Sequence, residues 1–151
     1  MLCPQCPAGI VWNDLTAVLY ALIKRIAEEE NADLDRISMT GLSMGGFGTW
    51  EFGMRYADLL CAIAPICGGG MAWRAEALKA VPVQAYHGDA DNVVAPSYSF
   101  EMVNALRRAG GQVTLTVFNG VGHDSWNPAY RTTNALEFLL SQRRGCSLLK
   151  K

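Results

Sequence analysis

Charge of either sign is sparse in this chain, and the two signs nearly cancel. Its 151 residues include 13 Lys and Arg against 14 Asp and Glu, for a formal net charge of −1. No basic run is interleaved with aromatic residues, the pattern with which many proteins bind nucleic acid. The composition therefore argues against a nucleic-acid partner. Its 50% of hydrophobic residues is enough for a single domain, residues 1–151, with a core of its own.

A long uninterrupted hydrophobic run is also missing. The most apolar stretch, residues 15–26, is interrupted by Tyr20, Lys24 and Arg25. It is shorter and more polar than the roughly 20 apolar residues of a membrane-spanning helix. The first seven residues contain no charged segment followed by an apolar one, as a secretory signal peptide would. We therefore expect no membrane association and a cytoplasmic location.

Cysteine patterns typical of metal sites are incomplete. The chain contains five cysteines, namely Cys3, Cys6, Cys61, Cys67 and Cys146. Cys3 and Cys6 form a C-x-x-C pair, which in other proteins binds zinc or carries out redox chemistry. A second such pair, or two histidines at ligand spacing, does not follow, and no glycine-rich phosphate loop is present. The sequence thus predicts reduced thiols, no bound metal and no cofactor.

What the chain does contain is a serine flanked by glycines between a predicted strand and a predicted helix. The run Gly41-Leu42-Ser43-Met44-Gly45-Gly46 is a G-x-S-x-G pattern. A strand–turn–helix with serine at the apex is a nucleophile elbow. The turn is expected to be too sharp for side chains at the flanking glycines, with Ser43 in a strained backbone conformation. The bare motif is equally compatible with a glycine-rich turn capped by serine.

Two polar loops also follow predicted strands. Strand 82–86 runs into a loop that contains Asp91, and strand 112–118 ends in a loop that contains His123. Ligands of open α/β sheets bind at the carboxyl edge of the strands, where these loops would meet the serine turn. The chain order of Ser43, an acid near position 91 and His123 is the order found in α/β-hydrolases.

Together these motifs resemble the α/β-hydrolase superfamily. Within it they are most similar to the predicted peptidases and esterases related to polyhydroxybutyrate depolymerases and feruloyl esterases. In chain order the matching segments are Pro4–Pro7, Gly41–Gly46, Ala64–Gly69, His87–Gly88 with Asp91, and Gly122–Asp124. The resemblance covers nearly all of the chain and implies an α/β fold, with a mainly parallel sheet flanked by helices. Family members carry several strands before the first of these segments, so we expect a shortened α/β-hydrolase fold, the C-terminal part of the family domain.

The serine turn and the resemblance together suggest catalytic roles. Ser43 is the expected nucleophile, and His123 the base that takes its proton. Asp91 is the expected acid that orients the imidazole, because it matches the family's His-Gly-x-x-Asp pattern. Asp89 occupies a variable position of that pattern. Asp124 adjoins His123 in the chain, and neighbouring side chains rarely point at each other.

Further candidates surround these three residues. The backbone N–H of Met44 is one expected donor of an oxyanion hole. The second donor normally follows an upstream strand, so the backbone near Gln5-Cys6 or another subunit would have to replace it. Trp12 and Trp126 are either walls of the substrate pocket or ordinary packing aromatics. His87 resembles a structural histidine of the family, expected to tether the acid loop by a hydrogen bond.

Hydrophobic periodicity predicts strands that alternate with helices, which favours a parallel sheet with right-handed crossovers. Helices are predicted over residues 15–26, 46–56, 73–78, 97–109 and 129–142. Strands are predicted over residues 36–41, 59–66, 82–86 and 112–118. Asn13 or Asp14 is expected to cap the first helix, and the tail 143–151 is expected to be frayed.

The sequence therefore predicts a serine esterase that cleaves small carboxylic esters through an acyl-enzyme. A peptidase or thioesterase is the near alternative, because such a triad sets acyl transfer and not the leaving group. A catalytically silent fragment is a third possibility, supported by the missing upstream strands. Without those strands, strand 36–41 and the apolar face of helix 15–26 would be uncovered, which predicts a homodimer.

Overall fold

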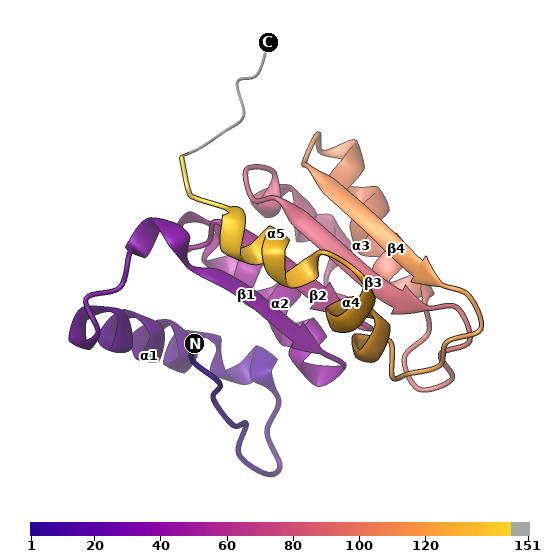
Figure 1. Cartoon of the computed structure of the whole chain (residues 1–151), viewed down its shortest axis with the longest axis horizontal. Helices are drawn as coiled ribbons and strands as arrows, with labels where there is room; N and C mark the ends of the chain where they lie inside the picture. Colours follow the sequence, from indigo (N-terminus) through magenta and orange to yellow (C-terminus); the bar gives the residue numbers. More distant parts are fainter. Residues whose placement is uncertain (146–151) are drawn as a thin grey trace.

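In the computed structural model, the chain forms a parallel sheet with helices on both faces (Figure 1). The structure describes residues 1–145. The strands lie in the order β1-β2-β3-β4, and each neighbouring pair is parallel. Their bounds are β1 Ser38–Leu42, β2 Ala62–Ile66, β3 Val83–Gly88 and β4 Val113–Phe118. This arrangement confirms the predicted α/β class and leaves β1 at one edge of the described sheet.

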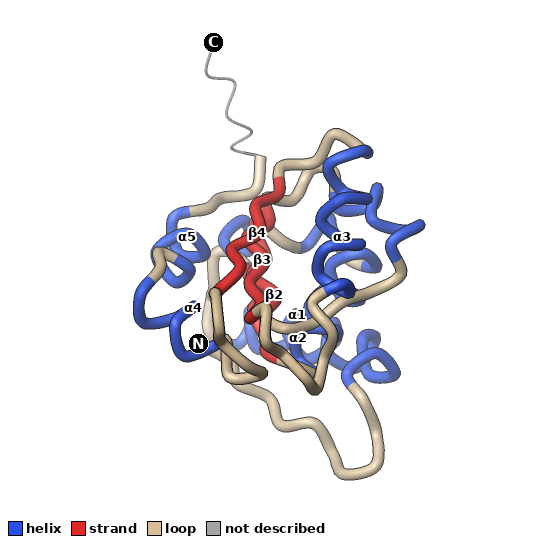
Figure 2. Tube along the Cα trace, turned by 90° about the vertical axis from the view of Figure 1, so that its right-hand side faces the viewer, coloured by secondary structure: helices blue, strands red, loops and turns tan. Residues whose placement is uncertain are grey.

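The helices divide between the two faces of the sheet. They are α1 (Thr16–Glu29), α2 (Met44–Arg55), α3 (Ser97–Arg108), α4 (Trp126–Thr132) and α5 (Ala135–Ser141). Short 3-10 turns are η1 (Trp12–Leu15), η2 (Leu34–Arg36), η3 (Ala57–Leu59) and η4 (Ala72–Leu78). Viewed along the sheet, α1, α2 and α3 lie on one side, and α4 and α5 on the other (Figure 2). Within residues 1–145, no helix combines the length and the hydrophobicity that crossing a bilayer requires.

Strand β2 separates the two cores. All five of its residues are buried. Ile63 packs into the larger core, which includes residues of α1, α2 and α3, whereas Ala62, Ala64 and Ile66 pack into the smaller core with α4 and α5. A strand covered on both faces is apolar at every position, because neither set of alternating side chains meets water. This is why β2 is recognisable in the sequence as a continuous hydrophobic run.

Most predicted elements differ from the structure by a few residues at their ends, and two differ for a clear structural reason. The strand predicted over 59–66 starts only at Ala62, because the chain first makes the 3-10 turn η3. The single helix predicted over 129–142 is in fact α4 followed by α5. The break falls at Thr133, whose extended backbone (φ −113°, ψ 176°) interrupts the helical hydrogen bonds. Its hydroxyl donates to the carbonyl of Ala129 at 2.5 Å, so the side chain helps to close α4.

The start of α1 also differs from the prediction. Asn13 and Asp14 lie inside η1, and the residue before α1 is Leu15, which makes no capping hydrogen bond from its side chain. The N–H of Asp14 donates instead to the carbonyl of Val11 at 3.1 Å. A 3-10 turn that runs straight into the helix thus takes the place of a capping side chain.

The prediction of a frayed tail is wrong at its first two residues, Arg143 and Arg144. Arg143 pairs with Asp33 at 2.5 Å and with Asp35 at 3.2 Å, and Arg144 pairs with Asp35 at 2.9 Å. These pairs are exposed, so each stabilises the fold only slightly. They nevertheless hold the chain beside η2 as far as Arg144. The remainder of the predicted tail, residues 146–151, lies outside the described residues.

Candidate active site

Ser43 sits between β1 and α2 in an unusual backbone conformation, with φ 53° and ψ −119°. A positive φ of this kind costs a non-glycine residue on the order of 1–3 kcal/mol. Its N–H donates to the carbonyl of Ile66 at 3.0 Å, and its carbonyl accepts the N–H of Phe47 at 3.0 Å. The strained turn predicted from the sequence is therefore confirmed.

Two glycines of the motif allow the close approaches that this turn makes. A Cβ on Gly41 would lie 2.4 Å from the carbonyl oxygen of Gly45, and a Cβ on Gly46 would lie 2.4 Å from that of Ile66. Both obstacles are backbone atoms, so a side chain at either place would push the elbow apart. A Cβ on Gly45 itself would meet nothing within 4 Å. The prediction that the flanking glycines leave no room is thus right at Gly41 and Gly46 but wrong at Gly45.

Ser43, His123 and Asp91 form a continuous line of hydrogen bonds. Ser43 Oγ lies 2.8 Å from His123 Nε2, and His123 Nδ1 lies 2.8 Å from Asp91 Oδ2. A carboxylate can only accept, so Nδ1 carries a proton, and Nε2 of the neutral ring accepts the Ser43 proton. The three residues follow β1, β4 and β3, respectively. The structure thus brings together, at the carboxyl edge of the sheet, the three residues that the sequence singled out.

The Asp91 side chain is fully buried, yet its environment favours the ionised form. Burial by itself raises the pKa of this carboxyl. Hydrogen bonds from His123 and from the N–H groups of Val94 and Val93 outweigh that effect, so the pKa is lowered overall. Both backbone bonds go to Oδ1 at 2.9 Å, which leaves Oδ2 for the imidazole. Asp91 therefore remains a carboxylate, which accepts the Nδ1 proton of His123.

The other two loop acids have different surroundings. Asp89 Oδ1 accepts the N–H of Gly120 at 2.7 Å, which ties the acid loop to the loop that carries His123. Asp124 is exposed to solvent. Of the three acids considered, Asp91 is the one that the structure pairs with the imidazole.

His87 is fully buried beneath the acid loop. Its Nε2 donates to the carbonyl of Val94 at 3.0 Å and lies 3.3 Å from Asp91 Oδ2. Its Nδ1 lies 2.7 Å from Ser99 Oγ, and that hydroxyl is 2.8 Å from the carbonyl of Gly68. These contacts join the acid loop, α3 and the segment after β2. The tether expected of His87 is therefore confirmed.

Three further candidates from the sequence are Met44, Trp126 and Trp12, and only the first two lie beside the predicted catalytic residues. Met44 is the first residue of α2, so its N–H is one of the helix N-terminal groups beside Ser43, and its side chain is 40% exposed. The ring of Trp126 stands edge-on to that of His123, with centroids 5.8 Å apart. A Cβ on Gly48 would lie 2.5 Å from the Cβ of Trp12, whose side chain packs on the larger core. The structure thus brings Trp126 to the site and places Trp12 in the packing between η1 and α2.

Cys67 also lies at this site, although it was not among the residues predicted from the sequence. This residue follows β2, is fully buried and has a φ of 40°. Its sulfur accepts the N–H of Ser43 at 3.3 Å. The donor atoms of Cys67, Asp91 and His123 lie within 4.8 Å of one another, a combination that can bind a metal ion, although the last two already bond to each other. The available signal was the place of Cys67 at the carboxyl end of a buried strand.

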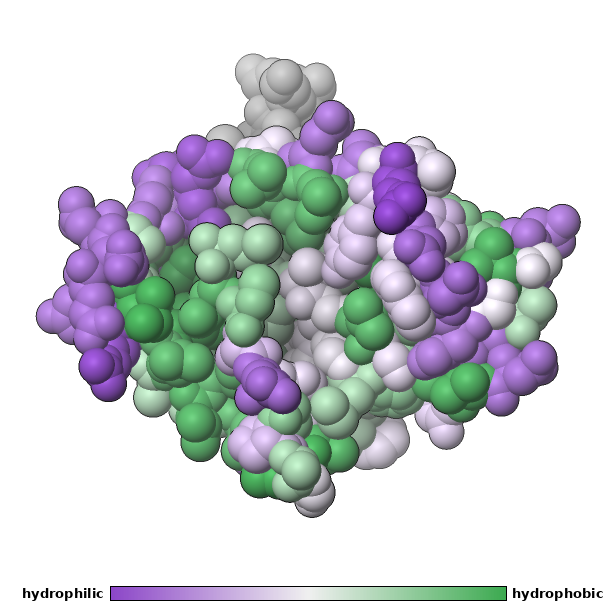
Figure 3. All heavy atoms as spheres, turned by 60° about the horizontal axis from the view of Figure 1, so that its bottom comes forward, coloured by the Kyte–Doolittle hydropathy of each residue, from purple (hydrophilic) through white to green (hydrophobic). Residues whose placement is uncertain are grey.

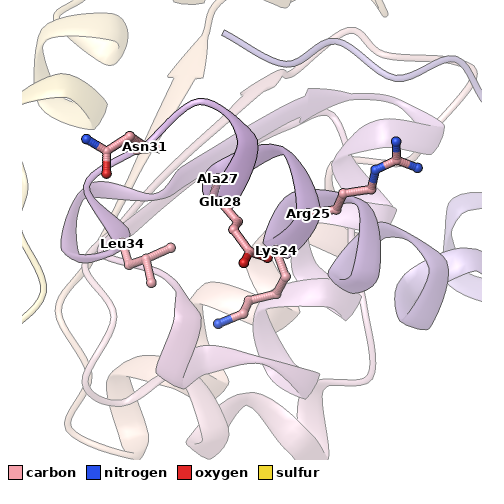
Figure 4. Close-up of a pocket in the computed structure, with 7 residues that line it drawn as sticks. Lys24, Arg25, Ala27, Glu28, Asn31 and Leu34 are labelled. Atoms are coloured by element: carbon pink, nitrogen blue, oxygen red, sulfur yellow. The ribbon is translucent and has the colours of Figure 1, made fainter.

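Two surface hollows of the described chain lie apart from these residues. One, of 640 Å³, is at the C-terminal end of α1 (Figure 4) and is lined by Lys24, Arg25, Ala27, Glu28, Asn31, Ala32 and Leu34. The other, of 770 Å³, includes Cys61, Lys79 and Arg144 and lies near the start of β2. Neither hollow includes a member of the Ser43–His123–Asp91 line.

The chain is similar to several known proteins. A sequence model of the prolyl oligopeptidase family matches residues 72–142. The bifunctional acetylxylan esterase/xylanase XynS20E of Neocallimastix patriciarum is 32% identical over 73 residues, which are 48% of this chain and 11% of that protein. The crystal structure of a thermostable esterase superposes with a TM-score of 0.89 at 34% identity, over 93% of this chain and 43% of that one. Esterase PE8 superposes with a TM-score of 0.69 at 25% identity, over 85% and 62% of the two chains.

The fold and these likenesses define the class of protein. The chain belongs to the α/β-hydrolase superfamily, and the proteins to which it is similar include esterases. It spans less than half the length of the thermostable esterase and about a tenth of that of the curated relative.

Proposed function

We propose that this chain is a serine hydrolase that cleaves small carboxylic esters through an acyl-enzyme intermediate. The observation that carries the proposal is the line of two 2.8 Å contacts from Ser43 through His123 to Asp91. A serine hydroxyl is nearly unreactive at neutral pH unless a positioned base takes its proton, and this line supplies one. The likeness to a thermostable esterase over 93% of the chain supports an ester as the substrate.

In the first half of the proposed reaction, Ser43 Oγ attacks the ester carbonyl while its proton moves to His123 Nε2. The carbonyl oxygen becomes an oxyanion, which the N–H of Met44 at the start of α2 would stabilise. His123, now an imidazolium held by Asp91, then gives the proton to the departing alcohol. The acyl group is left as an ester on Ser43.

In the second half, water attacks the acyl-enzyme and His123 again accepts a proton. Collapse of the second tetrahedral intermediate releases the carboxylic acid and returns the proton to Ser43 Oγ. Asp91 keeps the proton of the neutral imidazole on Nδ1 throughout, so Nε2 remains free to accept. Trp126, edge-on to the imidazole, is the proposed wall of the substrate site on this side.

A peptidase is the second candidate, because the prolyl oligopeptidase model matches residues 72–142, a range that contains Asp91 and His123. The same triad can cleave amides, so the leaving group of the substrate determines whether the enzyme acts as an esterase or as a peptidase. A panel of nitrophenyl esters of increasing acyl length, set beside aminoacyl nitroanilides and acyl thioesters, separates the candidates. Turnover of the esters alone supports the proposal, whereas turnover of the anilides at a comparable rate favours the peptidase.

Labelling with a fluorophosphonate tests the nucleophile directly. We expect modification of wild-type protein at Ser43, identified by mass spectrometry, and none of Ser43→Ala or His123→Ala. Ser97→Ala is the matched control, because Ser97 is exposed at the start of α3 and should leave labelling intact. A folded wild-type chain that neither reacts with the probe nor hydrolyses esters would instead be a silent fragment, and would overturn the proposal.

A further inference from the structure

Two residues with left-handed backbone meet at this site. Ser43 has a φ of 53° and Cys67 a φ of 40°, and the hydrogen bond from one to the other joins the ends of β1 and β2. Such a conformation costs a side-chain-bearing residue on the order of 1–3 kcal/mol, whereas glycine adopts it readily. Strain of this kind persists only where the surrounding contacts hold the backbone in place.

The side chain of Cys67 therefore stands where glycine would be easier to accommodate. Three glycines follow it directly in the chain. The Cys67 sulfur is fully buried and accepts the N–H of Ser43 at 3.3 Å, beside the bond from the same N–H to the carbonyl of Ile66 at 3.0 Å. Both acceptors around this N–H thus come from the end of β2, and one of them is a side chain.

The chemical state of the sulfur suits a supporting role. Burial raises the pKa of the Cys67 thiol, the Asp91 charge adds to the rise, and the Ser43 N–H and the Ser125 hydroxyl offset part of it. Cys67 accordingly stays a neutral thiol next to Asp91 and His123. A neutral group adds no second negative charge beside the imidazole, so the Asp91 carboxylate remains the charged partner of the ring.

We propose that Cys67 is a positioning residue for the nucleophile: its sulfur holds the strained backbone of Ser43 so that Oγ stays on His123 Nε2. This inference rests on the proposed function, in which Ser43 is the nucleophile. Cys67 bonds to the backbone N–H of Ser43 and acts through Ser43.

Substitutions at Cys67 distinguish a role in positioning Ser43 from a role in core packing alone. Cys67→Ala removes the acceptor, Cys67→Ser keeps one, and Cys67→Gly also relieves the left-handed strain. A misplaced nucleophile loses roughly ten- to a hundredfold in rate, so we expect kcat to fall by about that factor in the Ala and Gly variants, with KM nearly unchanged. The Ser variant should recover part of the loss. Cys67→Gly should lose less thermal stability than Cys67→Ala while losing as much kcat.

Cys61→Ala is the matched control. Cys61 is the other buried cysteine of the described chain, next to the first residue of β2, and its N–H donates to the carbonyl of Ile37 at 2.8 Å. We expect it to lower the melting temperature and to leave kcat unchanged. The proposal is overturned if kcat in the Cys67 variants stays at the wild-type value, or if Cys61→Ala lowers kcat as much as they do.

A measurement that needs no catalysis distinguishes this inference from the function on which it rests. The amide proton of Ser43, observed by ¹⁵N–¹H NMR, should shift upfield in Cys67→Ala and Cys67→Gly because it loses an acceptor. An unchanged Ser43 amide in these variants would refute the contact, whatever the enzyme assay shows. A shifted amide in a protein that no fluorophosphonate labels would support the contact and contradict the proposed function.

Discussion

At the scale of single residues, hydrogen-bond partners decide which acid serves the imidazole. Asp89 and Asp91 lie in the same loop, two residues apart, but Asp89 accepts a hydrogen bond from the backbone N–H of Gly120. Asp91 turns one oxygen to the N–H groups of its own loop and the other to His123. Identical side chains thus take different roles because each accepts hydrogen bonds from different groups.

The first prediction concerns this choice of acid. Asp91→Asn should lower kcat for ester hydrolysis by roughly 10³–10⁴-fold, because an amide N–H in place of Oδ2 favours the wrong imidazole tautomer. Asp89→Asn and Asp124→Asn are the controls and should each cost far less. Steady-state kinetics of the three variants decide the matter. The assignment fails if Asp124→Asn is the most damaging.

The second prediction is the pH dependence of stability that follows from the lowered pKa of Asp91. Folding favours the ionised carboxyl, so the stabilisation is fully present above the unfolded-state pKa of about 4. It is lost as pH falls through the lower pKa of the folded state. The stability gap between wild type and Asp91→Asn, measured by urea unfolding, should therefore stay nearly constant from pH 7 to about 5 and narrow as the pH is lowered below about 4. A gap that stays constant or widens below about pH 4 would contradict the pKa direction.

At the scale of elements, a buried carboxylate joins α2 to η4. Glu51 has a side chain only 3% exposed and pairs with Arg55 at 2.6 Å and with Arg74 at 2.9 Å. Arg55 extends from the next turn of α2, whereas Arg74 comes from η4. The helix that begins at the serine turn is thus anchored at its other end by charge as well as by the larger core.

The third prediction tests this anchor. Glu51→Ala should lower the free energy of unfolding by about 2 kcal/mol, below the cost of breaking a fully buried pair, because the two arginines are partly exposed and can turn to solvent. Glu101→Ala, at an exposed position of α3, is the control and should change it by less than about 0.5 kcal/mol. Chemical denaturation gives both values. Equal effects of the two substitutions would mean that the ion pairs of Glu51 stabilise the fold no more than an exposed charge does.

At the scale of the whole molecule, the β1 edge of the described sheet has no neighbouring strand, and part of the apolar face of α1 is exposed to solvent. β1 pairs only with β2 in the described sheet, and Val18 on α1 is 62% exposed. Figure 3 shows hydrophobic residues over much of the left half of the face on which α1 lies. Exposed apolar surface beside an unpaired strand edge is typical of an interface.

The fourth prediction is therefore a homodimer. A symmetric pair would cover both exposed edges at once and could bring a second oxyanion donor towards Ser43. Light scattering at micromolar concentration should give twice the 16.4 kDa of one chain. Val18→Glu should shift the protein towards monomer, whereas Leu140→Glu, at an equally exposed position on the opposite face, should not. A wild-type protein that stays monomeric at this concentration would disprove the prediction.

The sequence by itself was enough to predict the α/β class, the order of the elements and the residues of the line from Ser43 to Asp91. The class and the order of the elements depend on short-range patterns, such as apolar runs of strand length and polar loops that follow them. The choice of Asp91 over Asp89 depended on the resemblance to α/β-hydrolases. Gly41 and Gly46 are part of the same local signal, because the sharpness of the elbow is a property of adjacent residues.

Only the tertiary structure decided what these loops contact. The Cys67 sulfur reaches Ser43 across 24 residues, and His123 reaches it across 80. The tertiary structure also decided that Trp12 packs on α2 and that the helix predicted over 129–142 is interrupted at Thr133. Such contacts depend on the pairing of β1 with β2 and on the exact ends of the strands. A one-residue change in register leaves the hydrophobic pattern of a buried strand almost unaltered but moves every side chain at its end.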